Sequence, residues 1–202
     1  MATTRTYGDG CAIARALDVV GERWALLVVR ELLLGPKRYT DLRRGLPNAS
    51  PNVLAERLRE LERAGVIRRR KLPPPAGSRV YELTERGLEL EGVVIALGHW
   101  GGPVAGGAPV RSADSVVLAL RAQLDPGDLD ARYELRCGDE RFRIELDNGT
   151  ITAERGSAER PDATIEADPD TLDAVLRGRR PLTDATIEGD TTAVERLIRA
   201  LG

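Results

Sequence analysis

The chain has 202 residues, 42% of them apolar but only 3% aromatic, so it suits one or two domains with cores of Leu, Val, Ile and Ala. It has no apolar N-terminal signal segment and no stretch near the roughly 18 apolar residues of a membrane span, so we expect a cytoplasmic protein without a membrane partner. The net charge of −2 divides into +5 up to Pro103 (17 Lys and Arg, 12 Asp and Glu) and −7 beyond it (13 and 20). This division predicts two domains with different partners, of which only the first suits nucleic acid.

The first half is predicted to hold several short helices and one hairpin. Helices are expected at Cys11–Val20, Trp24–Leu34 and Thr40–Arg44, from Pro51 to a stop at Gly65, and, after a Thr84 cap, at Glu85–Leu97. Ser50 before Pro51 is a helix-start signal. Val66–Lys71 and Arg79–Leu83 flank a tip rich in Pro and Gly, which predicts a hairpin. Helix, short helix, turn, helix and hairpin follow each other in the order of a winged helix-turn-helix.

The helix from Pro51 is the candidate element for reading DNA. Leu54, Leu58 and Leu61 share one face, and a polar stripe lies opposite them. We expect Asn52, Glu56 and Arg59 to contact bases, and Arg57 or Arg63 to reach phosphate. Thr40 and Ser50 are expected to donate to phosphate while they cap their helices. The alternative for this helix is a solvated face held by ion pairs such as Glu56 with Arg59.

The hairpin favours the DNA interpretation. Basic residues lie on both sides of its tip, where folding does not need them. The expected phosphate contacts are Arg68, Arg70, Lys71 and Arg79.

The second half is predicted to be a small α+β domain, so the whole chain is α+β. We expect domains at 1–103 and 111–202 with a glycine-rich linker at 104–110. A helix is predicted at Asp114–Leu124, and strands at Arg132–Arg136, Arg141–Leu146 and Thr150–Glu154. The segment Asp162–Glu166 recurs as Asp184–Glu188, each copy followed by an apolar helix, which predicts two strand-helix units on one small sheet.

Several segments of the first half resemble HxlR-type winged-helix transcription regulators over about residues 8–102. They are Cys11-Ala12-Ile13, Gly21-Glu22-Arg23-Trp24, Leu34–Leu42, Leu54–Gly65 and Tyr81–Gly87. The resemblance implies a homodimer, joined mainly by the N-terminal helix and the helix after the wing, that binds a pseudo-palindromic operator in double-stranded DNA. The three consecutive prolines at the wing tip depart from the shorter tips of this family and make the wing stiffer.

The second half resembles sterol-carrier-type lipid-transfer domains, through the units Asp162–Arg177 and Thr183–Leu201. In that family a sheet and its covering helices enclose an apolar tunnel. The resemblance therefore implies a small apolar ligand that controls the regulator. The alternative is a closed domain that only stabilises the dimer.

The two cysteines, the single histidine and Asp168 are the remaining candidates for redox chemistry or metal binding. Cys11 is a candidate thiol sensor, as in some relatives of the family, with Arg15 one turn away. The alternative is a small, buried apolar residue in a dimerisation helix. Cys11, Cys137 and His99 cannot form a four-ligand zinc site without several carboxylates, and no His/Asp set activates a nucleophile. We expect no metal, no cofactor and no catalytic residue. Asp168 is expected to cap a helix rather than to bind calcium.

The sequence therefore predicts a dimeric, DNA-binding transcription regulator that is not an enzyme. The alternative function is a hydrophobic-metabolite carrier that uses its winged helix mainly for dimerisation.

Overall fold

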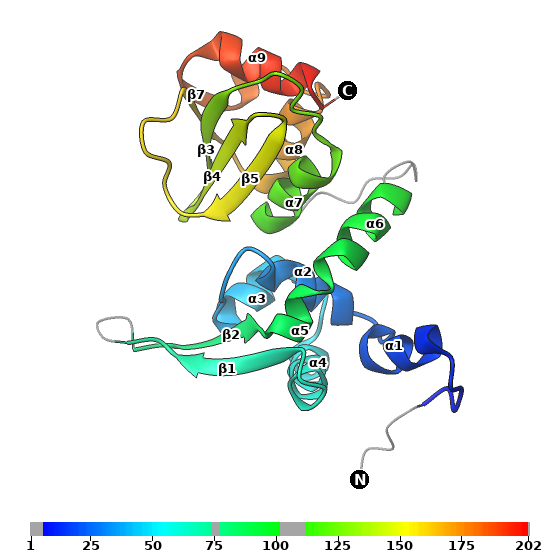
Figure 1. Ribbon diagram of the computed structural model, residues 1–202. Helices are drawn as coiled ribbons and strands as arrows, with labels where there is room; N and C mark the ends of the chain where they lie inside the picture. The colour runs from blue at the N-terminus through cyan, green and yellow to red at the C-terminus, as the bar shows by residue number, and fades with distance from the viewer. Residues whose placement is uncertain (1–5, 74–76, 102–111, 202) are drawn as a thin grey trace. The chain divides into compact units, whose positions relative to one another are not determined.

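The computed structural model describes residues 6–73, 77–101 and 112–201 (Figure 1). The chain divides into two compact units, Met1–Val94 and Ile95–Gly202. The expected linker at 104–110 lies outside the described residues, as do Pro74, Pro75 and Ala76 of the wing tip.

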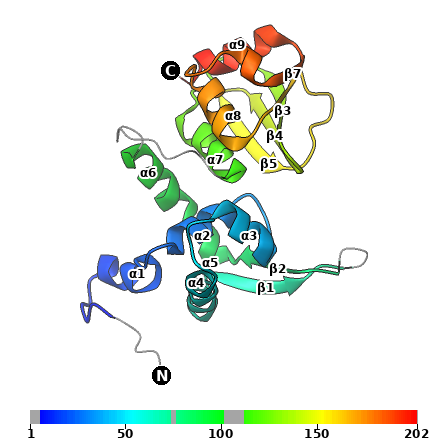
Figure 2. The same cartoon turned by 180° about the vertical axis from the view of Figure 1, so that it is seen from behind.

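The first unit packs helices around an aliphatic core and extends a hairpin from it (Figures 1 and 2). Its elements are α1 (Ala12–Val20), α2 (Ala25–Leu32), α3 (Tyr39–Gly45), α4 (Pro51–Arg63), β1 (Ile67–Lys71), β2 (Arg79–Leu83) and α5 (Glu85–Leu88). Val28, Leu42, Leu54 and Leu58 are almost completely buried in this core. The expected order of helix, short helix, turn, helix and hairpin is confirmed.

The α2 and α3 helices begin at other residues than predicted. Trp24 has a φ of 78°, in the left-handed region, so α2 begins only at Ala25. The α3 helix begins one residue before Thr40 and is capped at Arg38, whose N–H donates to the Asp41 carboxylate at 3.2 Å. The expected capping role of Thr40 is therefore wrong; this residue lies exposed inside the first turn.

The single helix predicted over Glu85–Leu97 is two helices, α5 and α6 (Glu91–Gly101). Thr84 caps α5 as expected, because its hydroxyl accepts the Gly87 N–H at 3.1 Å. The Leu90 N–H then bonds the Gly87 carbonyl three residues back, which tightens the turn. The break lets Leu90 and Val94 pack against the core of the first unit.

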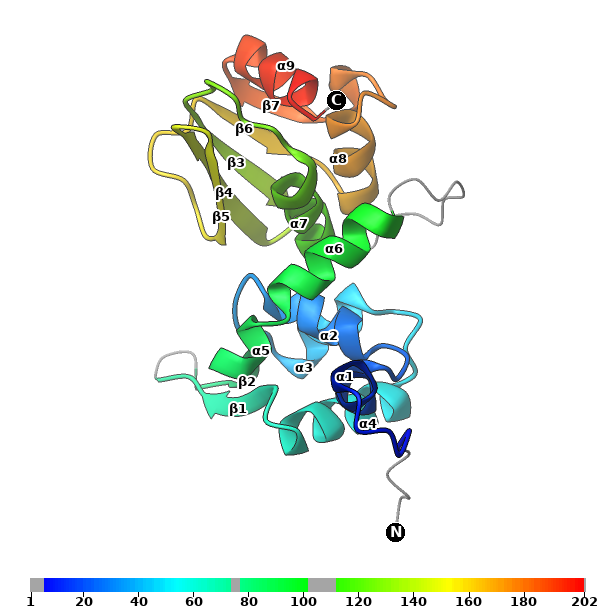
Figure 3. The same ribbon diagram turned by 45° about the vertical axis from the view of Figure 1, so that its right-hand side comes forward.

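The second unit is a five-stranded sheet with helices against one face (Figure 3). The strand order is β5 (Thr150–Arg155), β4 (Glu140–Asp147), β3 (Ala131–Cys137), β6 (Ala163–Glu166) and β7 (Thr186–Gly189). Only the β3–β6 pair is parallel. The helices are α7 (Ala113–Gln123), α8 (Pro169–Leu176) and α9 (Thr191–Arg199), and a 3-10 turn covers Leu182–Asp184.

The internal repeat forms two neighbouring strand-helix units, as predicted. The repeated strands β6 and β7 pair with each other, so that Ile165 lies opposite Ile187. An aspartate caps each following helix: Asp168 accepts two backbone N–H groups at the start of α8, and Asp190 accepts one at the start of α9. The capping role expected of Asp168 is confirmed.

None of the helices in residues 6–73, 77–101 and 112–201 combines the length and apolar character needed to cross a bilayer. The same part of the chain holds no group of three or more His, Cys, Asp or Glu side chains arranged to bind a metal ion.

Candidate nucleic-acid interface

The N-terminus of α4 is held by two contacts. The Ser50 hydroxyl accepts the Val53 N–H at 3.4 Å, and Pro51 occupies the first turn, as the sequence predicted. The Tyr39 hydroxyl of α3 donates to the Pro51 carbonyl at 3.1 Å. These contacts link the start of α4 to the preceding helix, so its first turn has a fixed position.

The two faces of α4 divide as the sequence predicted. Leu54, Leu58 and Leu61 are buried, whereas Asn52, Arg59 and Arg63 are exposed on the opposite side with the half-buried Glu56. Among the described residues, neither Arg59 nor Arg63 has an ion-pair partner. The stripe is thus not a set of mutually neutralised charges, and its two guanidinium groups are available to an anionic partner.

Arg57 has a different environment from the one expected. Its side chain is 10% exposed and forms an ion pair with Glu60, and carboxylate oxygens of Glu22 and Glu56 lie 3.8 Å from it. Burial and three nearby carboxylates make Arg57 a poor phosphate ligand. Its position favours a role in packing α4 against the loop between α1 and α2.

The β1–β2 hairpin places its basic residues on two faces. Strand register puts Arg68 opposite Glu82 and Lys71 opposite Arg79. Glu82 bonds both Arg68 and Arg70, whose side chains share its face. Lys71 and Arg79 are exposed near the tip and have no ion pair within the described part of the chain. All four predicted wing residues therefore present cationic groups at the surface.

Three residues of this region were missed by reasoning from the sequence. Glu82 is the only acid in the two strands, a signal that could have singled it out. Arg69 bonds Glu62 of α4, and the Lys37 backbone pairs with Tyr81 as a short extension of the hairpin. Arg69 and Lys37 carry no comparable signal, because their partners come from other elements.

The two cysteines differ in environment. Cys11 is exposed just before α1, and hydrogen bonds from the backbone N–H groups of Ala14 and Ile13 lower the pKa of its thiol. This lowering comes from the start of the helix and not from Arg15. Cys137 is buried at the end of β3, and this burial, with the nearby Glu140 charge, raises its pKa to about 12. Cys11 therefore lies outside the core of the first unit, and it remains a candidate both for a thiol sensor and for an apolar residue of a dimer interface.

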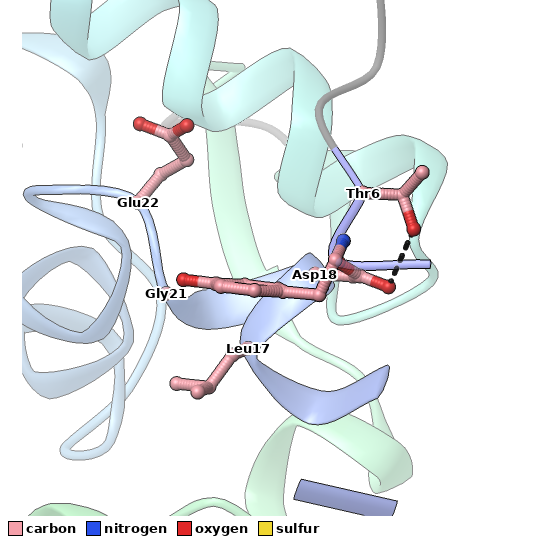
Figure 4. A pocket seen from close by; sticks show the side chains of 6 residues that line it. Thr6, Leu17, Asp18, Gly21 and Glu22 are labelled. Carbon is pink, nitrogen blue, oxygen red and sulfur yellow. Dashed lines mark hydrogen bonds between the residues drawn. The ribbon is translucent and has the colours of Figure 1, made fainter. Parts of the chain in front are cut away.

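The α1 helix carries an open pocket and exposed apolar side chains. The pocket has a volume of about 270 Å³ and is lined by Thr6, Tyr7, Leu17, Asp18, Gly21 and Glu22 (Figure 4). The Thr6 hydroxyl and the Tyr7 N–H both donate to Asp18, at 3.0 and 2.8 Å. Large exposed apolar side chains are Ile13 and Leu17 on α1, and Val93, Leu97 and Trp100 on α6.

The second unit has a small cavity among α7, α8 and the C-terminal end of the chain. Its volume is about 10 Å³. A space of this size is about that of one water molecule, so this cavity as it stands cannot hold an apolar ligand.

The first unit is similar in sequence to known proteins. Residues 19–106 match the HxlR-like helix-turn-helix family. The HTH-type transcriptional regulator YvaP of Bacillus subtilis is 37% identical over 86 residues, which cover 43% of this chain and 80% of YvaP. The HTH-type transcriptional regulator YodB of the same species is 36% identical over 85 residues, which cover 42% of this chain and 76% of YodB. The solved reduced form of YodB is 33% identical, covers 48% of this chain and 98% of its own, and superposes with a TM-score of 0.42. From its residues 19–106 and its identity to these regulators, the chain belongs to the HxlR-like helix-turn-helix family.

Proposed function

We propose that this protein is a sequence-specific transcription regulator that binds double-stranded DNA through α4 and the β1–β2 wing. The observation that carries the proposal is the exposed stripe of α4, in which Arg59 and Arg63 have no ion pair among the described residues. A helix of this kind fits the major groove, and a neighbouring basic hairpin fits the phosphate backbone. Family membership supports the same function.

The contacts divide into two classes by position. Asn52, Glu56 and Arg59 lie in the first turns of α4 and are assigned to base edges. Phosphate contacts are assigned to Thr40, Ser50, Arg63, Arg68, Arg70, Lys71 and Arg79. Arg57 is left out of both classes because Glu60, Glu22 and Glu56 surround it.

The proposed regulator is a homodimer that binds a pseudo-palindromic operator. The exposed apolar residues of α1 and α6 support this assembly, because patches of this kind mark interaction surfaces. Two recognition helices related by a two-fold axis read half-sites about 10 base pairs apart. Such a regulator acts in the cytoplasm.

Two signals are proposed to control the dimer. An apolar ligand at the second unit would alter the separation of the recognition helices and so the operator affinity. A ligand that enters the cavity of about 10 Å³ between α7 and α8 would have to separate these two helices. The second signal is oxidation or alkylation of Cys11, supported by its exposure and its lowered pKa.

Selection of bound sequences from random duplex DNA tests the function directly. The full-length protein at near-physiological salt is expected to enrich a two-fold-related motif with half-sites about 10 base pairs apart. A matched selection with the Asn52→Ala/Arg59→Ala variant should lose the motif but keep weak, salt-dependent binding. Enrichment of no sequence by the unmodified protein would overturn the proposal. Titration of apolar ligands without any change in operator affinity would remove the ligand signal alone.

A further inference from the structure

We propose that Glu82 is a positioning residue for DNA binding, which holds Arg68 and Arg70 side by side on one face of the wing. The inference rests on the proposed function, because it assigns how the wing presents its charges to phosphate. Glu82 itself touches no DNA in this proposal. It acts through the two arginines.

The contacts are symmetrical about the carboxylate. The Arg68 Nε–H donates to Glu82 Oε1 at 2.7 Å, and the Arg70 Nε–H donates to Oε2 at 2.7 Å. Arg68 lies directly opposite Glu82 in the strand register, and Arg70 is two residues along on the same face. Each arginine therefore uses only its inner nitrogen. Within the described residues, the two terminal nitrogens of each guanidinium group bind no other group.

Glu82 is nearly buried, whereas the two arginines that it binds are exposed. The Glu82 side chain is 10% exposed, whereas those of Arg68 and Arg70 are 66% and 44% exposed. Burial alone would raise the pKa of Glu82, but the hydrogen bonds and charges of Arg70 and Arg68 outweigh it and hold the pKa below its ordinary value. The carboxylate is thus ionised at neutral pH and available as an anchor.

Anchoring matters because a free arginine side chain has many rotamers. Binding DNA with such a side chain costs conformational entropy when it is immobilised on a phosphate. An arginine already held by Glu82 has lost part of that freedom in the unbound protein. The terminal nitrogens that remain can form the paired hydrogen bonds that arginine makes with phosphate.

Glu82 has a second effect of opposite sign. A carboxylate near DNA repels phosphate, so a role limited to charge predicts that its removal strengthens binding. The positioning role predicts that its removal weakens binding. The direction of the change therefore decides between the two.

The test compares Glu82→Gln with the unmodified full-length protein, by fluorescence anisotropy on a labelled duplex at several salt concentrations. We expect about fivefold weaker binding, equal on selected and arbitrary sequences, as expected for phosphate contacts held in place before binding. Glu85→Gln in α5, an exposed acid of the same unit, is the matched control and should change affinity little. Equal or tighter binding by Glu82→Gln overturns the inference.

Repeating the Glu82→Gln substitution in a variant without the two arginines distinguishes a positioning role of Glu82 from general damage to the fold. In Arg68→Ala/Arg70→Ala protein no arginine remains for Glu82 to position, so adding Glu82→Gln should leave affinity unchanged or raise it. A further loss in this background would show a general structural role and overturn the inference. If the unmodified protein shows no salt-dependent DNA binding at all, the proposed DNA-binding function is wrong. The inference about Glu82, which rests on that function, is then wrong with it.

One measurement needs no substitution of Glu82. In nitrogen-15 NMR spectra of the unbound protein, the Nε–H signals of Arg68 and Arg70 should be ordered and protected from exchange. Arg59 and Arg63 supply the internal comparison, and Arg68→Lys and Arg70→Lys assign the signals. If the four arginines prove equally mobile, the anchoring by Glu82 does not exist in solution.

Discussion

Arg69 of the wing is bonded to Glu62 of α4, with 3.0 Å between the guanidinium Nη2 and the carboxylate Oε2. The same guanidinium lies over the Tyr81 ring, 5.4 Å from its centroid. Arg69 is on the opposite face of the hairpin from Arg68 and Arg70. It therefore joins the hairpin to α4, whereas Arg68 and Arg70 bind Glu82.

Replacing Arg69 should weaken the contact between the hairpin and α4 and so lower the stability of the first unit. Arg69→Ala removes one ion pair and one cation–π contact, both partly exposed, and should cost about 1 kcal/mol of the stability of the first unit. Denaturant unfolding followed by Trp24 fluorescence measures this cost, in a Trp100→Phe background because Trp100 is 79% exposed. Arg63→Ala, which removes no ion pair with any residue that the structure describes, should cost less than about 0.5 kcal/mol. Equal losses of stability in the two variants would show that the contacts of Arg69 with Glu62 and Tyr81 do not stabilise the first unit.

Arg59 and Arg79 should differ in their effect on DNA binding. Arg59→Ala should relax base preference and cost about 1–3 kcal/mol on the selected motif, because arginine on α4 is assigned to a base edge. Arg79→Ala should weaken binding to all sequences alike and reduce the salt slope by about one unit. Anisotropy on matched and scrambled duplexes distinguishes them, and identical behaviour of the two variants would contradict the assigned roles.

The two cysteines should differ in reactivity. At pH 7 to 8 the thiolate is the reactive species, and its fraction is larger where the thiol pKa is lower. Cys11 is exposed with a lowered pKa, whereas burial raises that of Cys137 to about 12. Iodoacetamide followed by mass spectrometry should label Cys11 first, and Cys137 only after denaturation. Cys11→Ser supplies the control, and labelling of Cys137 in that folded variant would contradict the environments described.

The Asp168 cap should make α8 sensitive to acid. Hydrogen bonds from the Thr171 hydroxyl and from backbone N–H groups lower the pKa of Asp168 below its unfolded value of roughly 3.9. The stability that this charge adds is thus present above that value and is lost as the pH falls through the lower, folded pKa.

Two variants of Asp168 separate the contribution of its oxygen as a hydrogen-bond acceptor from the contribution of its negative charge. Asp168→Ala should cost about 1 kcal/mol at pH 7, whereas Asp168→Asn keeps an oxygen acceptor and should cost less. Hydrogen exchange of the α8 amides, followed by mass spectrometry, reports both. The difference between the unmodified protein and Asp168→Asn should shrink below about pH 4; a constant difference would exclude the charge as its cause.

Much of the fold could be predicted from the sequence, because its signals are local. The spacing of Leu54, Leu58 and Leu61 determined which face of α4 is buried, and Ser50 with Pro51 determined where that helix begins. The Asn148-Gly149 loop joins β4 and β5, and Asn-Gly is a favoured two-residue hairpin loop. Each of these signals acts within a few residues of chain, where propensity and capping dominate.

Only the tertiary structure decided which charged residues are paired and which are free. Arg57, Arg59 and Arg63 are alike in the sequence, yet Arg57 alone contacts Glu22, which lies in a distant loop. Glu82 meets Arg68 across 14 positions of chain because the strand register brings them together. The order β5-β4-β3-β6-β7 is likewise set by packing between distant segments. The physical reason is that an ion pair or a strand pair depends on distance in space, and the spacing of residues along one element does not contain that distance.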